Sequence, residues 1–504
     1  MSMFQGVGHN IKMGGPLAGP GIGTFGALNT LDEFEAFAKA VQTAGDPHVL
    51  DFKGQLTGVP AIRLEALDGV LRAVTEREET YTLWRRLTRK RTRSSVYEWA
   101  TKTSIGGEVG NTYHSEFSSI RKARTEFNRD VLRIKYLMTS AEITVAAKMQ
   151  QTVEDIKAEE NESATNRLLR DVEWGLFAGD ERVVPQQFDG IFAKLQRDYP
   201  RNIIDMNGSA NTEEIYNAVY EAFGRVRGPE GGFGRITDAY VTPAVQNDLD
   251  LFLHPQWRVK LDKGVDIEYG APVVGLNTSH GKVALNQSVW IEESSYPNIT
   301  APAIVRAGMI SPNAPGAPTL AVTIPAGTDP LSRFTTGRQG TYWYAVAAIS
   351  ENGEGPLSAI QTAAVPLNGV ARLTITPPPT QTQTGFVIYR SQQNPATTPV
   401  AADLRLMIRV PNPNPANPGA TLVFDDRNHN LPGSSKIFLL DLDERSLDWV
   451  QLLPLLQFPL FPTDRAAYPW AVLLFGALRL AIPRRHWVLN NIVPRNLRWR
   501  PHTA

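Results

Sequence analysis

Residues 340–358, GTYWYAVAAISENGEGPLS, constrain the fold of this chain more than any other stretch. Apolar side chains occupy every second position, which is the period of a strand with one buried face. These side chains are Tyr342, Tyr344, Val346 and Ala348. Asn352, Gly353 and Gly355 follow and favour the positive-φ positions of a tight turn. The chain therefore contains an antiparallel β module.

This strand and turn resemble the penultimate strand of a fibronectin type III or immunoglobulin-like sandwich. We expect the module to span 310–435, after a Pro/Ala/Gly-rich linker at 299–320. Its later strands are predicted at 385–391 and 420–426. Beyond residue 435, further strands need partners outside the sandwich; they are predicted at 437–442, 470–478 and 486–492. The sandwich is therefore predicted to be an insertion into an α+β host.

Helical spacing of apolar residues predicts several helices in the host. The ranges are 29–45, 62–87, 152–178, 211–228 and a helix that opens with Thr242 and Pro243 after a strand from 236. Gly179 is expected to end the longest helix in the left-handed conformation. Two β-rich arms within 94–138 flank a polar stretch, which predicts a long hairpin. Because an isolated hairpin is marginal in water, we expect it to lie on a neighbouring subunit.

Composition excludes several classes of function. Lys plus Arg and Asp plus Glu both number 51, whereas a free-standing nucleic-acid binder is usually basic. Cys is absent, and the eight His show no metal-ligand spacing. The sequence GIGTFG at 21–26 lacks a preceding strand, and no G-x-S-x-G occurs. We therefore predict no catalytic residue, no cofactor, no metal and no enzyme activity. No signal peptide or membrane span is expected.

A basic run at 85–93 is the strongest charge feature. It has three interpretations: a subunit contact to acidic stretches such as 154–160, a solvated helix end, or a non-specific phosphate contact. Zero net charge with both signs in blocks favours the subunit contact, as in a chain that assembles with itself.

The order of these parts resembles the major capsid protein of tailed bacteriophages, with the HK97-type fold. The resemblance is carried by LLRDVEWGLFAGDERVVPQQFDGI at 168–191, ITDAYVTPAVQNDL at 236–249 and FGALRLAIPRRHWVLNNI at 475–492. It implies an N-terminal arm at 1–29, an extended loop at 94–138, a spine helix at 152–178 and an axial domain around 203–292. The expected domains are 1–61, 62–202, 203–309, the inserted 310–435 and the returning 436–504.

The resemblance implies hexamers and pentamers that form an icosahedral head around double-stranded DNA. The chain would assemble in the host cytoplasm and reside in the virion. Few residues precede the first predicted helix, so a separate scaffolding protein is expected, and a portal and a decoration protein are further candidate partners. DNA contacts would be non-specific. Candidate subunit-contact residues are Arg85, Arg86, Arg89, Lys90, Arg91, Arg93, Trp99, Lys102, Tyr113, Arg121, Lys122, Arg124, Glu154, Glu159 and Glu160.

Two alternatives rest on the sandwich module. One is a surface adhesin or carbohydrate-binding protein, for which Trp343 is the candidate ligand contact because Tyr342 and Tyr344 point into the module. The other is a carbohydrate-active enzyme, which needs a carboxylate pair in a cleft, and the sequence singles out no such pair.

Overall fold

The computed structural model describes residues 80–502, with gaps at 108, 111, 121, 150–154, 210, 258–274, 279–280, 293–299, 307–309, 379–381, 415–419, 463–464, 496 and 498. The chain divides into two compact units, Met1–Ala73 and Val74–Ala504, and the second contains all described residues. The predicted arm at 1–29, the helix at 29–45 and most of the helix at 62–87 lie outside them.

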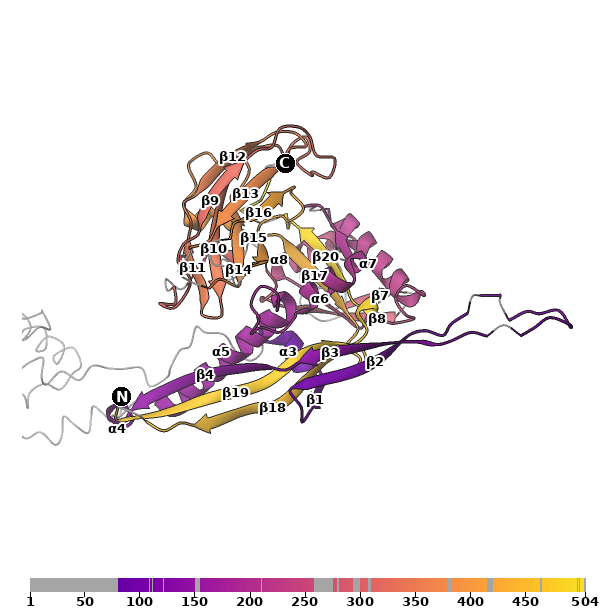
Figure 1. The fold of residues 1–504 in the computed structure, drawn as a ribbon, viewed down its shortest axis with the longest axis horizontal. Helices are drawn as coiled ribbons and strands as arrows, with labels where there is room; N and C mark the ends of the chain where they lie inside the picture. The colour runs from indigo at the N-terminus through magenta and orange to yellow at the C-terminus, as the bar shows by residue number, and fades with distance from the viewer. Residues whose placement is uncertain are drawn as a thin grey trace, which may run out of the picture. The chain divides into compact units, whose positions relative to one another are not determined.

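A four-stranded sheet joins segments from distant parts of the chain (Figure 1). Its order is β1-β18-β19-β4. The strands are β1 (Arg89–Arg91), β18 (Leu447–Pro459), β19 (Ala467–Leu480) and β4 (Lys135–Thr144). β4 pairs antiparallel with β19 along ten residue pairs from Ala467↔Thr144 to Gly476↔Lys135. The prediction that the strand around 470–478 returns to the host is therefore confirmed.

The longest helix, α5 (Ile156–Ala178), covers one face of this sheet. The Asp155 carboxylate accepts a hydrogen bond from the Lys157 amide at 2.9 Å, which caps the first turn. Apolar residues four apart face the sheet and are buried: Ala164, Leu168, Val172 and Leu176. The predicted helix is confirmed, and a short helix, α4 (Val145–Met149), precedes it.

The predicted left-handed Gly179 is wrong, because its φ is −61° and its ψ is 142°. A glycine is needed there for a different reason. A Cβ at this position would lie 2.6 Å from the carbonyl oxygen of Phe188. The chain leaves the helix so close to the following loop that only glycine fits.

Glu173 of α5 is fully buried and caps a short helix, α3 (Thr82–Arg86), from 90 residues away. Its carboxylate oxygens accept hydrogen bonds from the amides of Leu83 at 2.9 Å and Trp84 at 2.8 Å. Burial raises the pKa of Glu173 to about 7, and the two amide hydrogen bonds only partly oppose this shift.

A second sheet of six strands has the order β5-β20-β17-β6-β8-β7. The strands are β5 (Ile203–Asp205), β6 (Asp238–Val241), β7 (Gly275–Thr278), β8 (Gly281–Gln287), β17 (Ser435–Leu440) and β20 (Trp487–Ile492). The accompanying helices are α6 (Ile191–Asp198), α7 (Thr212–Arg227) and α8 (Pro243–Trp257), with 3-10 turns η4 (Pro200–Asn202) and η6 (Pro483–Arg485). The predicted α+β architecture of the host is thus confirmed.

The structure confirms only some of the helix caps that the sequence predicts. Asn211 accepts a hydrogen bond from the Glu213 amide at 3.1 Å, so the predicted start of α7 is confirmed. α8 begins at Pro243, as predicted. The Thr242 hydroxyl, however, bonds to the Ser435 hydroxyl at 2.7 Å and links the start of α8 to β17.

Eight strands between residues 319 and 426 form two sheets that enclose a common core. One sheet is β16-β13-β9, and the other is β11-β10-β14-β15, with β12 paired to β10. The strands are β9 (Thr319–Thr323), β10 (Gly340–Ser350), β11 (Gly353–Leu357), β12 (Gln361–Val365), β13 (Ala371–Thr376), β14 (Gly385–Arg390), β15 (Arg405–Pro411) and β16 (Leu422–Asp426), with a 3-10 turn η5 (Ala401–Asp403).

The sequence misjudged the place of the most diagnostic strand. β10 is the second strand of this module in chain order, not the penultimate one. Of the three predicted turn residues, Gly353 alone has a positive φ, of 110°. Gly355 is required instead because a Cβ there would meet the carbonyl oxygen of Pro315 at 2.0 Å. The immunoglobulin-like character of the module stays a prediction.

The sheet order shows how the chain leaves and re-enters the host. It leaves after β8, makes the eight strands, and returns as β17, which pairs with β6 through Phe438↔Tyr240. β6 in turn pairs with β8. The departing and returning strands therefore flank one central strand of the host, as expected for an insertion (Figure 1).

Candidate subunit-interaction surfaces

A two-stranded hairpin carries many of the predicted contact residues. It pairs β2 (Val96–Ser104) with β3 (Glu126–Arg133), and residues 96–133 are here called the long hairpin. The predicted range of 94–138 is too long. Ile134 is buried and the chain then enters β4, so residues 135–138 pair with β19 in the four-stranded sheet. A buried apolar residue at this corner fixes the hairpin base to the host core.

The long hairpin exposes apolar side chains along its length and around its tip. Phe117 is 95% exposed and Ile120 is 83% exposed. Others that are also exposed are Val96, Ile105, Val109, Tyr113, Phe127 and Val131. Burial of such side chains against another surface is favourable, because it removes apolar area from water. Several large apolar side chains exposed on one element make it a candidate interaction surface.

Several predicted contact residues lie on the long hairpin without a described partner surface. Tyr113, Lys122 and Arg124 are exposed near its tip. Arg121 lies outside the described residues. Among the residues that the structure describes, no contact groups these side chains into a site, so their role in subunit contact stays a prediction.

The basic run at 85–93 is not one helix end. Arg85 and Arg86 belong to α3, whereas Arg89 to Arg91 form β1 and Arg93 follows in the next loop. Arg86 forms an ion pair with Asp238 at 2.7 Å and donates to Asn286 at 3.1 Å, so it holds α3 to the six-stranded sheet. The remaining basic residues of the run are exposed.

A groove brings together four of the predicted residues, Arg89, Lys90, Trp99 and Lys102. It lies between β1, the base of the long hairpin and β18–β19. Arg445 and Arg479 also line it, as do the acids Glu444 and Asp448. Arg479 and Asp448 pair with each other at 2.6 Å. The remaining lining charges leave this basic groove with a net positive character, which suits an acidic partner.

The cationic side chains of the basic groove lie against aromatic rings. The Arg89 guanidinium lies 4.6 Å from the Trp84 ring centroid, and Lys90 lies 5.3 Å from that of Tyr97. Trp99 stacks on Tyr97, with centroids 6.3 Å apart, and Arg479 lies over both rings. Cation–π contacts limit the rotamers of the cations while leaving their charge available to a partner.

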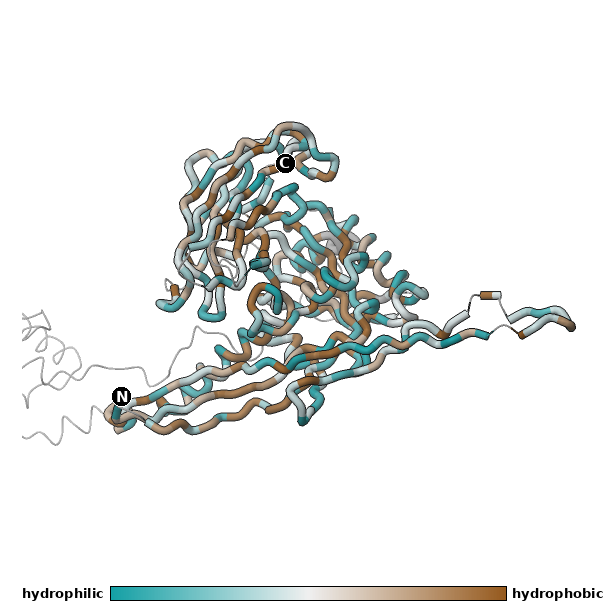
Figure 2. The backbone as a smooth tube through the Cα atoms, in the orientation of Figure 1, coloured by the Kyte–Doolittle hydropathy of each residue, from teal (hydrophilic) through white to brown (hydrophobic). Residues whose placement is uncertain are grey.

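A second surface was missed by the sequence analysis. On the face of the four-stranded sheet that points away from α5, Met138, Leu473 and Leu456 lie opposite one another across β4, β19 and β18. Met138 is 65% exposed, and Tyr136, Leu456 and Phe458 are also exposed. We call these four residues the apolar sheet face. Apolar residues run along β18 and β19 in Figure 2.

Among the described residues, only β1 pairs with the edge of β18 beside this face, over a short part of its length. β1 pairs with β18 only through Trp449, Val450 and Gln451. The signal in the sequence was LLPLLQFPLF at 452–461, which lacks the polar alternation of a strand with one solvated face. Apolar residues on both faces predict that something covers the second face.

The acidic start of α5 is the remaining predicted surface. Glu159 and Glu160 lie in its first turns and are half-buried, and Glu154 lies outside the described residues. Asp155 and Glu162 are exposed beside them.

The described residues offer little catalytic chemistry. No group of three or more His, Asp or Glu among them could hold a metal ion. His486 and His502 are buried, and burial lowers the pKa of each to about 3, so both are neutral structural side chains. In the same part of the chain, no helix is long and apolar enough to cross a bilayer.

Comparison with known proteins gives relatives in sequence that are phage major capsid proteins. No protein-family model matches the chain. The major capsid protein of Staphylococcus phage K is 23% identical over 447 residues, covering 86% of this chain and 90% of that protein. A putative major capsid protein of Enterococcus phage phiEF24C is 24% identical over 454 residues, covering 86% and 91%.

Solved structures that match include the capsid of Myoviridae phage XM1, with 7% identity, a TM-score of 0.43 and coverage of 87% of this chain and 100% of that one. The capsid of cyanophage P-SCSP1u has 10% identity, a TM-score of 0.40 and coverage of 88% and 98%. The sequence similarity to phage major capsid proteins therefore spans most of this chain and most of each relative.

Proposed function

We propose that this chain is the major capsid protein of a bacteriophage and that its copies form the shell of the virion. The sequence similarity to phage major capsid proteins over 86% of the chain carries the proposal. We infer that hexamers and pentamers build an icosahedral head of the HK97 type around double-stranded DNA. In such closed symmetry each contact is repeated many times, so each can be modest while the shell is stable.

The long hairpin and the apolar sheet face support this function because each is incomplete alone. The hairpin exposes Phe117, Ile120 and their neighbours, and the sheet exposes Met138 and Phe458. We infer that the hairpin of one copy lies on the sheet of the next. Burial of both apolar sets would then occur only on assembly, which makes the contact a driving force for it.

Charge complementarity gives the second support. The basic groove contains Arg89, Lys90 and Lys102, and the start of α5 carries Glu159 and Glu160. A pairing of these surfaces between copies accounts for a chain with zero net charge and separate blocks of each sign.

Other partners follow from the proposed role. We infer a separate scaffolding protein, a portal, a decoration protein and non-specific contact with packaged DNA. We also infer that the protein is structural and catalyses no reaction.

The adhesin alternative is not favoured. The large apolar side chains that are exposed in the described part of the module are aliphatic: Ile324, Leu331, Leu367, Val400 and Val423. Carbohydrate sites commonly use fully exposed aromatic faces, whereas Trp343 on β10 is only partly exposed.

Electron microscopy of the purified full chain at rising concentration tests the proposed function. Closed shells, tubes or rings of six subunits are expected, either alone or with a candidate scaffolding protein. A chain that stays monomeric at every concentration, with and without that partner, contradicts it.

A further inference from the structure

The inserted module has a strand, β14, that is buried on both faces and that begins against the host. In β14 every residue is buried, so both faces of this strand are covered. Phe386 and Ile388 point into the core between the two sheets of the module, while Val387 and Tyr389 belong to a separate buried cluster on the opposite face. The sheets of an independent sandwich each keep one solvated face. The cluster on the second face of β14 is built from module residues, including Leu404 and Leu406. Contact with the host is made at the first residue of β14, Gly385, beside Val183. We call this boundary between module and host the seam.

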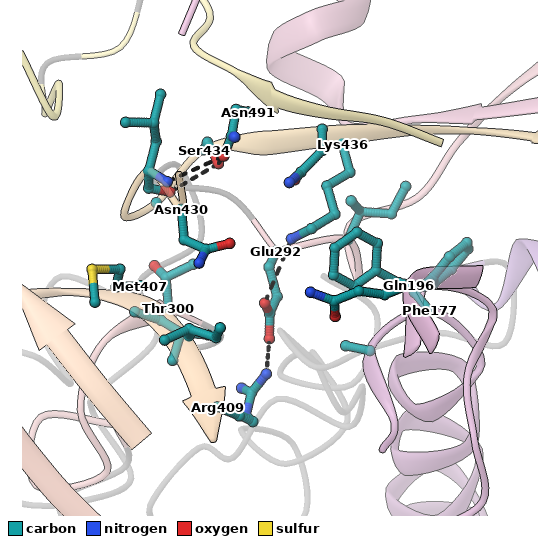
Figure 3. Close-up of a pocket in the computed structure, with 18 of the residues that line it drawn as sticks. Phe177, Gln196, Glu292, Thr300, Met407, Arg409, Asn430, Ser434, Lys436 and Asn491 are labelled. Carbon is teal, nitrogen blue, oxygen red and sulfur yellow. Dashed lines mark hydrogen bonds and ion pairs between the residues drawn. The ribbon is translucent and has the colours of Figure 1, made fainter. Parts of the chain in front are cut away.

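A group of three charges lies at this seam, where the chain enters and leaves the module. Glu292 follows β8, Lys436 is in the returning β17, and Arg409 is in β15 of the module. The Glu292 carboxylate accepts from Arg409 and lies 3.9 Å from the Lys436 ammonium (Figure 3). All three side chains are largely buried. We call them the charged latch.

Host aromatic residues hold the two cations of the latch. The Arg409 guanidinium lies 5.0 Å from the centroid of Trp174 in α5. The Lys436 ammonium lies 5.1 Å from that of Phe192 in α6. The Glu292 carboxylate thus pairs with one cation from the module and one from the returning strand β17. Each of these cations also contacts an aromatic ring of a host helix. The adjoining cavity, of about 90 Å³, has room for a few water molecules rather than a ligand.

Further contacts along the seam agree with a fixed position. A Cβ at Gly385 in β14 would lie 2.8 Å from Val183 of the loop after α5, so the module backbone lies directly against the host. Gln186 donates to Glu351 at 2.6 Å, and Arg338 donates to Asn207 at 2.6 Å.

The segment that follows β20 also forms hydrogen bonds between the host and the module. Trp499 follows β20 and donates its indole N–H to the Asp403 carbonyl at 2.9 Å, and the Pro501 carbonyl accepts from the Gln393 amide at 3.1 Å. Both Trp499 and Pro501 are buried.

We propose that the inserted module is a rigid part of the subunit, and that the charged latch of Glu292, Arg409 and Lys436 fixes its orientation on the host. Glu292 has the central role because it compensates two buried cations at once. Removing one partner of a buried ionic group leaves uncompensated charge, which costs far more than losing an exposed pair. The seam should therefore open when Glu292 is neutralised, while the two sheets of the module stay folded on their own core.

Hydrogen exchange of the full chain, followed by mass spectrometry of its peptides, tests this proposal. In Glu292→Gln, exchange in β14 and β17 should rise on the order of tenfold or more, and exchange in β13, within the other sheet of the module, should stay unchanged. The matched control is Arg372→Met, which breaks the exposed Arg372–Asp425 pair inside the module and should leave the seam protected. Unchanged exchange at the seam in Glu292→Gln overturns the proposal.

A second variant covers the case in which Glu292→Gln unfolds the whole chain. The triple variant Glu292→Met, Arg409→Met, Lys436→Met removes all three charges together and leaves none uncompensated. If the triple variant folds and its seam exchanges faster than in the natural chain, the result supports the charged latch as the element that fixes the orientation of the module. Restored folding with a seam as protected as in the natural chain overturns it, because apolar packing alone would then fix the module. Both measurements use unassembled subunits, so they are independent of shell formation.

Discussion

At the residue scale, buried charges in this protein differ in whether a cation compensates them. Arg390 is fully buried in the module and donates to Asp426 at 2.7 Å and to Asn428 at 2.7 Å. Glu173 is equally buried, but its hydrogen-bond partners are the amides and hydroxyl at the start of α3. These two residues therefore respond differently to substitution and to pH.

Glu173 should make stability fall as pH rises. Its folded pKa of about 7 lies above the ordinary value of 4.5 for a glutamate, so the folded state keeps a proton that the unfolded state loses between these values. The stability that protonation provides is present at low pH and is lost as pH rises through about 7, by roughly 3 kcal/mol at most.

Urea unfolding of the natural chain and of Glu173→Gln at pH 5, 6, 7 and 8 measures this effect. The natural chain should lose stability across the series relative to the variant, which has no titrating group at this position. Parallel pH profiles for the two proteins would show that Glu173 stays ionised throughout.

Arg390→Met should destabilise the module by about 3–5 kcal/mol, because it leaves the Asp426 carboxylate buried without its cation. Tyr344 still donates to Asp426 at 2.9 Å, but a hydroxyl does not neutralise the charge. The denaturation midpoint should fall in Arg390→Met and stay nearly constant in the exposed control Arg372→Met. Equal midpoints would show that apolar packing dominates at Arg390.

At the element scale, the long hairpin and the apolar sheet face expose large apolar side chains that no other described part of the chain covers. Met138→Ser and Phe458→Ser change exposed side chains, so the folded subunit should keep its melting temperature. Assembly should weaken, with the concentration for half-assembly rising on the order of tenfold, because the side chains lose the apolar burial gained in the shell. Light scattering at rising concentration measures it.

The matched control for these variants is Leu331→Ser, which removes an exposed aliphatic side chain from the module. It should leave both folding and assembly as they are. If all three variants assemble alike, the apolar sheet face is not a subunit contact, and another surface must cover the hairpin.

At the scale of the whole molecule, separate blocks of opposite charge predict salt-sensitive association. Arg89→Glu with Lys90→Glu should block assembly, because like charges then face the start of α5 on the next copy. Glu159→Lys with Glu160→Lys should do the same. A mixture of the two variants, or one chain with all four changes, should recover part of the assembly. Absence of recovery in native gels at low salt would contradict this pairing.

The sequence determined the local elements. Apolar residues four apart predicted α5, Pro243 predicted the start of α8, and alternation predicted β10 with Tyr342 and Tyr344 inside, and all three predictions are confirmed. It also determined the order of parts that resembles phage capsid proteins. These features depend on neighbours along the chain, because helical and strand periods are local properties.

The tertiary structure alone decided how distant segments combine. Gly179 and Gly355 are required by close approaches to Phe188 and Pro315, not by positive φ as their turns suggested. Arg86 pairs with Asp238 from another sheet, although the sequence placed it in a basic surface run. The position of β10 among the module's strands and the apolar sheet face likewise follow from pairings between segments far apart in sequence. Such pairings depend on which strands become neighbours in space, and no local period encodes that choice.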